Sequence, residues 1–305
     1  MSGLETIKLL HYGKCNDIFL AKDSKGNQFA LKRFYREELE KRKEYINRDG
    51  KLVKKDWFED FKRALEVQKV LDNESCIKLH GIFGIDFSPE KPTFEDEIDL
   101  VFEYAEFGSL MSLESFQEEV PNFPKEVIKC ITKDVLNALL YRDFGESEFM
   151  TEDGKVKGSR GTYYFLAPEV LEINSSTLSI PDSFEIVELW IIDENDGNAI
   201  DMWALGITLW ILYFRNFPFY GNSGSIYETI TNIQNFNFKT QIQTLKPNNS
   251  HEKLEDEDEF VDLLEKILEK DPKKRIKPKE ALNHNWLRNV DYEAAREYCR
   301  RNIKK

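Results

Sequence analysis

The sequence reads Asp143-Phe144-Gly145, continues through a polar loop to Gly161-Thr162, and then reaches Ala167-Pro168-Glu169. Either outer triplet alone is common by chance. Both triplets in this order, with Thr162 and Phe165 between them, form a specific pattern that chance rarely produces. The rest of the chain therefore has to fit the fold that this stretch indicates.

The composition is that of a large folded protein. Of the 305 residues, 41% are hydrophobic and 13% are aromatic, which is enough to bury a sizeable core and suits two lobes. The 43 basic and 56 acidic residues give a formal net charge of -13, which disfavours a nucleic acid as partner. The four cysteines have no close pair, so reduced thiols are expected rather than a disulfide framework or a zinc site: Cys15, Cys76, Cys130 and Cys299.

The sequence gives no sign of a membrane segment. The residues after Met1 lack an apolar core of signal-peptide length, and no run approaches the roughly 20 apolar residues of a membrane span. The apolar run that opens at Asp201 and ends at Phe214 is too short, so it predicts a buried central helix. We therefore expect no membrane contact and a cytoplasmic location, with the nucleus as the alternative.

Hydrophobic periodicity predicts strands in the first third of the chain and mostly helices afterwards. Residues 6–34 alternate apolar and polar side chains and break at Gly13 and at residues 24–27, as three antiparallel strands would. Residues 36–57 are heavily charged and predict a solvated excursion. The later elements are expected as a helix at 57–71, strands at 77–87 and 98–104, and a core helix at 124–141.

The chain resembles a eukaryotic Ser/Thr protein kinase domain over nearly its whole length. The resemblance rests on residues 29–32, 143–145, 161–169, 201–206 and 271–286. It implies an α+β fold with a small β-rich N-lobe at about 1–104 and a larger helical C-lobe at about 105–287, so that the kinase domain spans 1–287. A helical tail at 288–305 would follow. ATP, Mg²⁺ and a protein substrate or partner are implied with the fold.

The resemblance implies roles for residues of the first lobe. Lys32 would pair with the α and β phosphates of ATP, and Glu66 would orient Lys32, with Glu59 or a plain surface role for Glu66 as alternatives. The other residues of the implied ATP site are Gly13, Ile18, Ala30, Phe102, Glu103 and Ala105. From the residues alone, a solvated Lys32 and a buried strand without a ligand around Phe102 stay open.

The Gly-rich loop that the resemblance implies keeps only its middle glycine. The family pattern falls on His11, Gly13, Asn16 and Ile18, so Gly13 alone matches. His11 and Asn16 leave fewer backbone amides able to approach phosphates closely. We therefore expect ATP to be held more weakly than by a complete loop.

In the second lobe, the resemblance makes Asp143 the magnesium ligand and places Thr162 and Glu169 in the activation segment. Arg275 is expected to form a buried ion pair with Glu169, and loss of either partner alone would cost roughly 3 to 5 kcal/mol. Asp201 is expected to have a structural role. Residues 172–197 form an insertion longer than kinases usually carry, and no role is assigned to it.

The chain departs from the family just before Asp143. Protein kinases carry His-Arg-Asp-x-x-x-x-Asn upstream of the first triplet. Here Tyr141, and not a histidine, stands directly before Arg142 and Asp143. Roughly thirty family residues, including the catalytic base and a second magnesium ligand, are then absent between Tyr141 and Asp143. Three explanations stay open: a gene model that skipped an exon, a real inactive variant acting as a binding or scaffold protein, and an unusual active site.

The absent segment also has structural consequences. In the family it contacts the counterparts of Asp201 and Thr162, so we expect both residues to lack their usual partners and the join at 141–145 to be strained. Within the superfamily, the charged segment after Lys32 and residues 100–110 look most like the calcium/calmodulin-dependent protein kinase kinases. The basic tail at 292–304 predicts a plain terminal helix, with a calmodulin target as the less favoured alternative.

Overall fold

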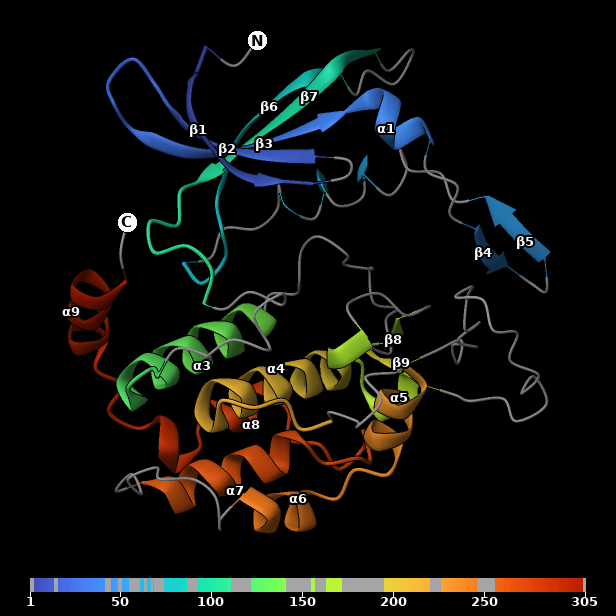
Figure 1. Ribbon diagram of the computed structural model, residues 1–305, viewed down its shortest axis with the longest axis vertical. Helices are drawn as coiled ribbons and strands as arrows, with labels where there is room; N and C mark the ends of the chain where they lie inside the picture. The colour runs from blue at the N-terminus through green and yellow to red at the C-terminus, as the bar shows by residue number, and fades with distance from the viewer. Residues whose placement is uncertain are drawn as a thin grey trace. The chain divides into compact units, whose positions relative to one another are not determined.

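The structure is a computed structural model, and the chain in it divides into two compact units, Met1–Gly108 with Lys305, and Ser109–Lys304 (Figure 1). The residues that it describes are 3–13, 16–41, 45–48, 51–54, 61–62, 65–66, 68, 74–86, 93–110, 122–140, 155–156, 163–171, 195–219, 226–245 and 256–303. The first unit is built on a β-sheet and the second is mainly helical. This is the division into a β-rich and a helical part that a kinase fold requires.

The sheet of the N-terminal unit contains five of the described strands in the order β1-β2-β3-β7-β6 (Figure 1). Its antiparallel strands are β1 (Glu5–Tyr12), β2 (Asn16–Lys22), β3 (Gln28–Tyr35), β6 (Leu79–Asp86) and β7 (Thr93–Glu103). The three strands predicted within residues 6–34 are confirmed. The Asp23 carboxylate accepts the amide hydrogens of Lys25 and Asn27, which closes the turn between β2 and β3.

Strand β7 begins earlier than the predicted residue 98, and its pairing with β6 is irregular near this start. The register between β6 and β7 shifts between Phe83 and Ile85, and pairing resumes with Ile85 opposite Phe94. Gly84 has φ +80°, and a Cβ at this position would lie 2.1 Å from the Glu97 carbonyl oxygen. Only glycine therefore fits at position 84, and the extra residues of the irregular pairing, 95–98, belong to β7, which starts at Thr93.

The charged excursion predicted after β3 contains regular structure. It holds α1 (Arg36–Lys41) and a hairpin of β4 (Tyr45–Arg48) and β5 (Lys51–Lys54). The described residues of the predicted helix at 57–71, namely 61–62, 65–66 and 68, are helical. They lie in the same unit as the sheet.

The C-terminal unit is a helical assembly around one buried helix (Figure 1). Its helices are α3 (Lys125–Leu139), α4 (Gly197–Phe214), α5 (Ile226–Gln234), α6 (Phe238–Leu245), α7 (Glu257–Ile267), α8 (Pro278–Ala281) and α9 (Tyr292–Asn302). Short 3₁₀ turns lie at η2 (Tyr163–Phe165), η3 (Pro168–Val170) and η5 (Asn285–Leu287), and β8 (Lys155–Val156) pairs with β9 (Asn195–Asp196). The core helix predicted at 124–141 is confirmed as α3, with Pro124 as its N-cap residue.

The predicted central helix is present as α4, but it starts four residues before Asp201. The Asp196 carboxylate accepts the Ala199 amide hydrogen at 3.1 Å and caps the helix, so the helix begins at Gly197. Among the described helices α4 is long and apolar enough to cross a membrane by length and composition, yet 67% of its 18-residue window is buried inside the protein. Its own Trp203 and Trp210 are buried in one core cluster with aromatic side chains from outside the helix: Phe219, Phe236, Phe260 and Trp286.

Helix α9 packs on α3 (Figure 1). The Tyr292 hydroxyl donates to the Asp134 carboxylate at 2.7 Å, and the Tyr298 hydroxyl donates to the Asn122 carbonyl at 3.0 Å. Ala295 is buried between these two contacts. The tail therefore forms a terminal helix whose apolar face is used within the chain, and its binding of calmodulin stays a less favoured prediction.

Candidate functional site

Four residues predicted to bind ATP share one face of the N-terminal sheet. In the antiparallel register Ile18 lies opposite Lys32, and Ala30 lies opposite Phe102. Residues directly opposite each other, and residues two apart along a strand, point to the same face of a sheet. One face thus carries apolar side chains that suit a base and a lysine that suits phosphates, so these residues fit a nucleotide.

The Lys32 ammonium is held on this face by an aromatic ring. Its Nζ lies 5.1 Å from the centroid of the Phe34 ring, a cation–π distance. Phe34 in turn meets Phe61 edge-on, with ring centroids 5.0 Å apart. Because Phe61 belongs to the helical segment at 61–68, this segment packs on the same face of the sheet as Lys32.

The structure does not bring Glu66 and Lys32 together. Leu65 and Gln68 are buried, and the Gln68 side-chain amide donates to the Ile77 carbonyl at 2.7 Å. Glu66 lies about 100° and 160° around the helix from these two residues, and its side chain is exposed. Among the described residues Glu66 forms no ion pair with Lys32, and Glu59 lies outside them. The role predicted for Glu66 therefore stays a prediction.

The backbone groups at the end of β7 are already partly used. The Glu103 amide donates to the Lys78 carbonyl at 3.0 Å, and the Ala105 carbonyl accepts the Gly108 amide hydrogen at 3.1 Å. A base that binds here would have to use the opposite groups, the Glu103 carbonyl and the Ala105 amide.

Gly13 occupies a position that no other residue fits. A Cβ on Gly13 would lie 2.5 Å from the Asn16 carbonyl oxygen. The Gly13 amide donates to the Asp17 carboxylate at 3.3 Å. The one glycine retained from the expected loop is thus required by the close Asn16 carbonyl, and its amide is bound by Asp17, for which the sequence predicted no role.

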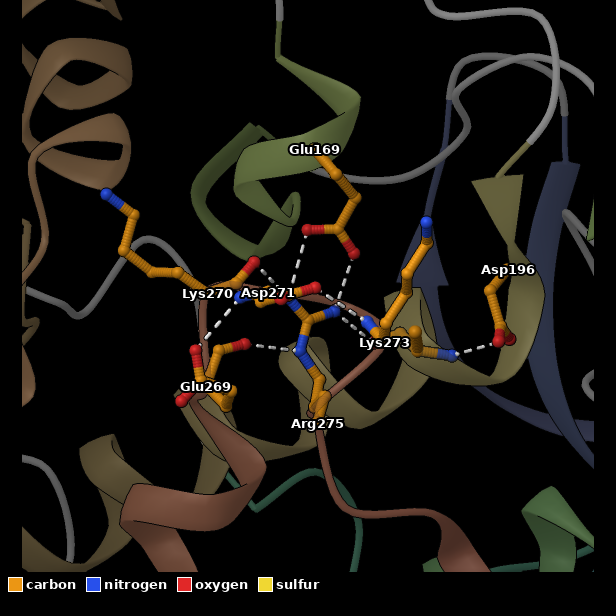
Figure 2. A network of polar contacts seen from close by, with 8 residues as sticks. Glu169, Asp196, Glu269, Lys270, Asp271, Lys273 and Arg275 are labelled. Carbon is orange, nitrogen blue, oxygen red and sulfur yellow. Dashed lines mark hydrogen bonds and ion pairs between the residues drawn. The ribbon is translucent and has the colours of Figure 1, made fainter.

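The buried ion pair predicted between Glu169 and Arg275 is present in the C-terminal unit (Figure 2). The Arg275 Nη1 and Nη2 donate to the two Glu169 carboxylate oxygens at 2.6 and 3.0 Å, a bidentate arrangement. Arg275 is 3% exposed, and it also donates to the Ala199 and Glu269 carbonyls at 2.6 and 2.8 Å. One guanidinium therefore joins η3, the start of α4 and the segment after α7.

A tight turn presents Arg275 to this network (Figure 2). The Asp271 carbonyl accepts the amide hydrogens of Lys274 and Arg275 at 2.9 and 3.0 Å. The Lys273 amide donates to the Asp271 carboxylate, and this hydrogen bond is the main cause that lowers the pKa of Asp271. Pro272 lies inside the turn, where its fixed φ is compatible with such a bend.

Asp201 and its neighbour Trp203 differ in what the structure shows of their contacts. Asp201 makes an interaction in the structure, and the expectation that it lacks the partner usual in the family stays a prediction. Within the described part of the chain, the buried Trp203 indole Nε1 makes no hydrogen bond. Its ring lies under the Arg275 guanidinium, 5.1 Å from Cζ to the ring centroid. No signal in the sequence distinguishes an unpaired indole from a paired one.

Two predicted residues of the second lobe lie outside the described residues. These are Asp143, the implied magnesium ligand, and Thr162 of the activation segment, and the join at 141–145 lies outside as well. Of the unassigned insertion, residues 172–194 are also outside, while Asn195–Asp196 form β9 and Gly197 starts α4. The magnesium site and the strain at the join stay predictions.

Comparison with known proteins gives matches to kinases. Residues 141–287 match the protein kinase domain. The chain is 27% identical over 325 residues to the serine/threonine-protein kinase ppk34 of Schizosaccharomyces pombe, covering 92% of this chain and 81% of that protein. It is 26% identical to a "Probable serine/threonine-protein kinase" of Dictyostelium discoideum, covering 85% of this chain and 34% of that protein. It is 25% identical to the serine/threonine-protein kinase OXI1 of Arabidopsis thaliana, covering 95% of this chain and 76% of that protein.

These matches and the architecture agree. The chain has the kinase-like fold, with an antiparallel sheet in the first unit and helices in the second. The match and the relatives support a eukaryotic Ser/Thr protein kinase domain, a family that in general uses ATP, Mg²⁺ and protein substrates. The chain spans about a third of the Dictyostelium relative's length, so what that whole protein does is not carried over.

Proposed function

We propose that this chain comes from an ATP-dependent Ser/Thr protein kinase, which transfers a phosphoryl group to hydroxyls of a protein substrate. The observation that carries the proposal is the bidentate Glu169–Arg275 pair inside residues 141–287, the segment that matches the protein kinase domain. The pair ties the second triplet of the sequence pattern to the core of the helical unit. A cytoplasmic or nuclear location and the likeness to calcium/calmodulin-dependent protein kinase kinases stay predictions.

The proposed roles follow the geometry of the first unit. Magnesium-bound ATP would supply the phosphoryl group. Lys32 would bind its phosphates, because its ammonium lies on the face that also carries Ile18, Ala30 and Phe102. These three apolar side chains would contact the base and exclude water from it. Asp143 is the proposed magnesium ligand.

A second proposal is that the chain as written binds nucleotide or protein but does not transfer phosphate. Three observations favour an absent segment. The match to the kinase domain begins at residue 141, where the sequence departs from the family. The alignment with ppk34 spans 325 residues, more than the 305 of this chain, so the relative has residues without a counterpart here. The buried Trp203 Nε1 has no hydrogen-bond partner.

The absent segment would remove the catalytic base. Positioned acid–base groups typically raise a reaction rate by about 10² to 10⁴, so their loss lowers the rate by that factor. The loss of the second magnesium ligand would lower the rate further. Purified chain with labelled ATP, Mg²⁺ and a generic protein substrate should therefore give turnover near background. Turnover that Lys32→Met abolishes would overturn the binding-protein proposal. Lys25→Met, at the exposed turn between β2 and β3, is the matched control.

Sequencing of transcripts separates the explanations for the gap. If some messages encode further residues between Tyr141 and Arg142, the chain as written is a shortened form, and the longer form should be the active kinase. If Tyr141 is joined directly to Arg142 in every message, the skipped-exon explanation is wrong. The kinase proposal for the parent itself fails if the longer form transfers no phosphate in the same assay.

A further inference from the structure

The face of the N-terminal sheet opposite Lys32 carries a buried carboxylate that has no role in the proposed site. Asp17 lies opposite Arg33 in the register of β2 and β3, so it points to the other face from Lys32. Asp17 is only 6% exposed. One of its oxygens accepts the Gly13 amide hydrogen at 3.3 Å, and the other accepts the Tyr35 hydroxyl hydrogen at 2.7 Å.

These two hydrogen bonds connect the β1–β2 loop to β3. Gly13 has no side chain, and a Cβ there would collide with the Asn16 carbonyl, so the amide is the group by which this position can be held. Tyr35 braces Asp17 from the end of β3. Its hydrogen bond to Asp17 raises the pKa of Tyr35 to about 12, so the hydroxyl keeps its proton and continues to donate at neutral pH.

We infer that Asp17 is a positioning residue for the β1–β2 loop, which it fixes through the Gly13 amide with Tyr35 as its brace. The inference deepens the proposed function and rests on it in one respect, that this loop receives the phosphates of a nucleotide. His11 and Asn16 stand where two of the expected glycines would be. Both have fewer accessible backbone conformations than glycine. A loop that is already held in shape loses less conformational freedom when a ligand binds.

A competing role for Asp17 is to brace the strands alone, and a second carboxylate allows the two roles to be separated. Asp99 is also 6% exposed and lies in the same row across the sheet, next to Arg33. It binds Arg33 through two hydrogen bonds at 2.7 and 2.9 Å, two strands away from the loop. Asp99→Asn therefore disturbs a buried carboxylate on the same face without removing an anchor of the loop.

The first test measures hydrogen exchange of the amides at residues 11–17 in the full chain without nucleotide. Asp17→Ala should accelerate exchange of the Gly13 amide by about tenfold, the factor expected for losing one hydrogen bond to a charged acceptor. Asp17→Asn keeps an acceptor oxygen and should restore most of the protection. Tyr35→Phe removes one oxygen only and should accelerate exchange several-fold, whereas Asp99→Asn should leave the loop unchanged.

Two outcomes overturn the inference: Gly13 exchange in Asp17→Ala that equals the unmodified chain, or an equal acceleration in Asp99→Asn. If Asp17→Ala does not fold, Tyr35→Phe decides, and normal exchange in that variant overturns the inference as well. This measurement needs no ligand. It therefore stands whether or not the proposed function is correct.

The second test compares the affinities for ATP and for adenosine. In Asp17→Ala, loss of loop positioning should weaken the affinity for ATP by about tenfold and change the affinity for adenosine by less than about twofold. The reason is that only ATP has phosphates for the loop to contact. Equal weakening of both ligands would mean a structural role alone and would overturn the inference. If the unmodified chain binds neither ligand, the nucleotide binding proposed for this chain fails, and the exchange measurement still decides the role of Asp17.

Discussion

Each unit contains an arginine that binds a carboxylate with two parallel hydrogen bonds. Arg33 binds Asp99 in the N-terminal sheet, and Arg275 binds Glu169 in the helical unit. Their surroundings differ, because the Arg33 side chain is 24% exposed while that of Arg275 is fully buried. The second carboxylate partner of Arg33 is the exposed Glu97, whereas Arg275 also donates to backbone carbonyls of its own unit.

The same pairing chemistry therefore need not make the same contribution to the free energy of unfolding. What matters is the state of the remaining partner after one side chain is removed. Water can reach the space that the partly exposed Arg33 side chain leaves, but it does not easily reach the space left by the fully buried Arg275 side chain. We therefore expect the cost of removing one partner to fall from Arg275 to Arg33, and to fall further for an exposed pair.

The largest effect is expected for Arg275→Met. This change leaves the largely buried Glu169 carboxylate and three backbone carbonyls without their donor, at a cost of about 3 to 5 kcal/mol in the free energy of unfolding. Urea unfolding followed by tryptophan fluorescence measures it, since Trp203, Trp210 and Trp286 are all buried in the C-terminal unit. A loss below about 1 kcal/mol would contradict the argument that burial makes this pair important.

A smaller effect is expected for Arg33→Met. Asp99 loses a charged donor but gains access to water, so the cost should be about 1 to 3 kcal/mol. Native-state hydrogen exchange at the amides of β3 and β7 measures it within the N-terminal unit. Arg36→Met, which removes an exposed partner of Glu40 one residue after β3, is the control. A larger loss than for Arg275→Met would reverse the comparison between the units.

The sequence predicts the local parts of the fold well and the non-local details less well. Alternation along residues 6–34 is a local property, and the three strands follow from it. The start of β7 lies beyond an irregular pairing with β6 at Gly84, where a positive φ and a close carbonyl on the neighbouring strand occur together. The start of α4 depends on the Asp196 cap, which the apolar run after Asp201 does not reveal.

The candidate site also has parts that the sequence predicts and parts that it does not. The Glu169–Arg275 pair could be predicted because both residues belong to sequence patterns of the kinase family. The orientation of Glu66 could not, since it depends on the rotation of a helix about its axis. The anchor formed by Asp17 and Tyr35 depends on the register between β2 and β3, in which one residue of slip would move Asp17 to the other face.

The smallest effect is expected for an exposed pair in the C-terminal unit. Asp262 is 54% exposed, and its carboxylate accepts hydrogen bonds from Lys266 at 2.6 Å and from His284 at 2.8 Å. Asp262→Asn should cost no more than about 0.5 kcal/mol at neutral pH, the usual range for exposed pairs one helical turn apart. The cost should shrink further in 1 M salt, where the screening length is about 3 Å.

The pH dependence of this pair gives the sharper test. The hydrogen bond from Lys266, and then that from His284, lower the pKa of Asp262 below its ordinary value. A carboxyl with a lowered pKa stabilises the folded chain above the pKa of the unfolded state, about 3.9, and this contribution is lost as the pH falls through the lowered value. The difference between the unmodified chain and Asp262→Asn should therefore disappear as the pH falls through the lowered pKa of Asp262. Glu265→Gln, an exposed acid on the same helix, controls for the loss of one negative charge. A difference that persists undiminished at low pH would mean that Asp262 contributes by packing, and exposure would then not be what separates it from the two arginine pairs.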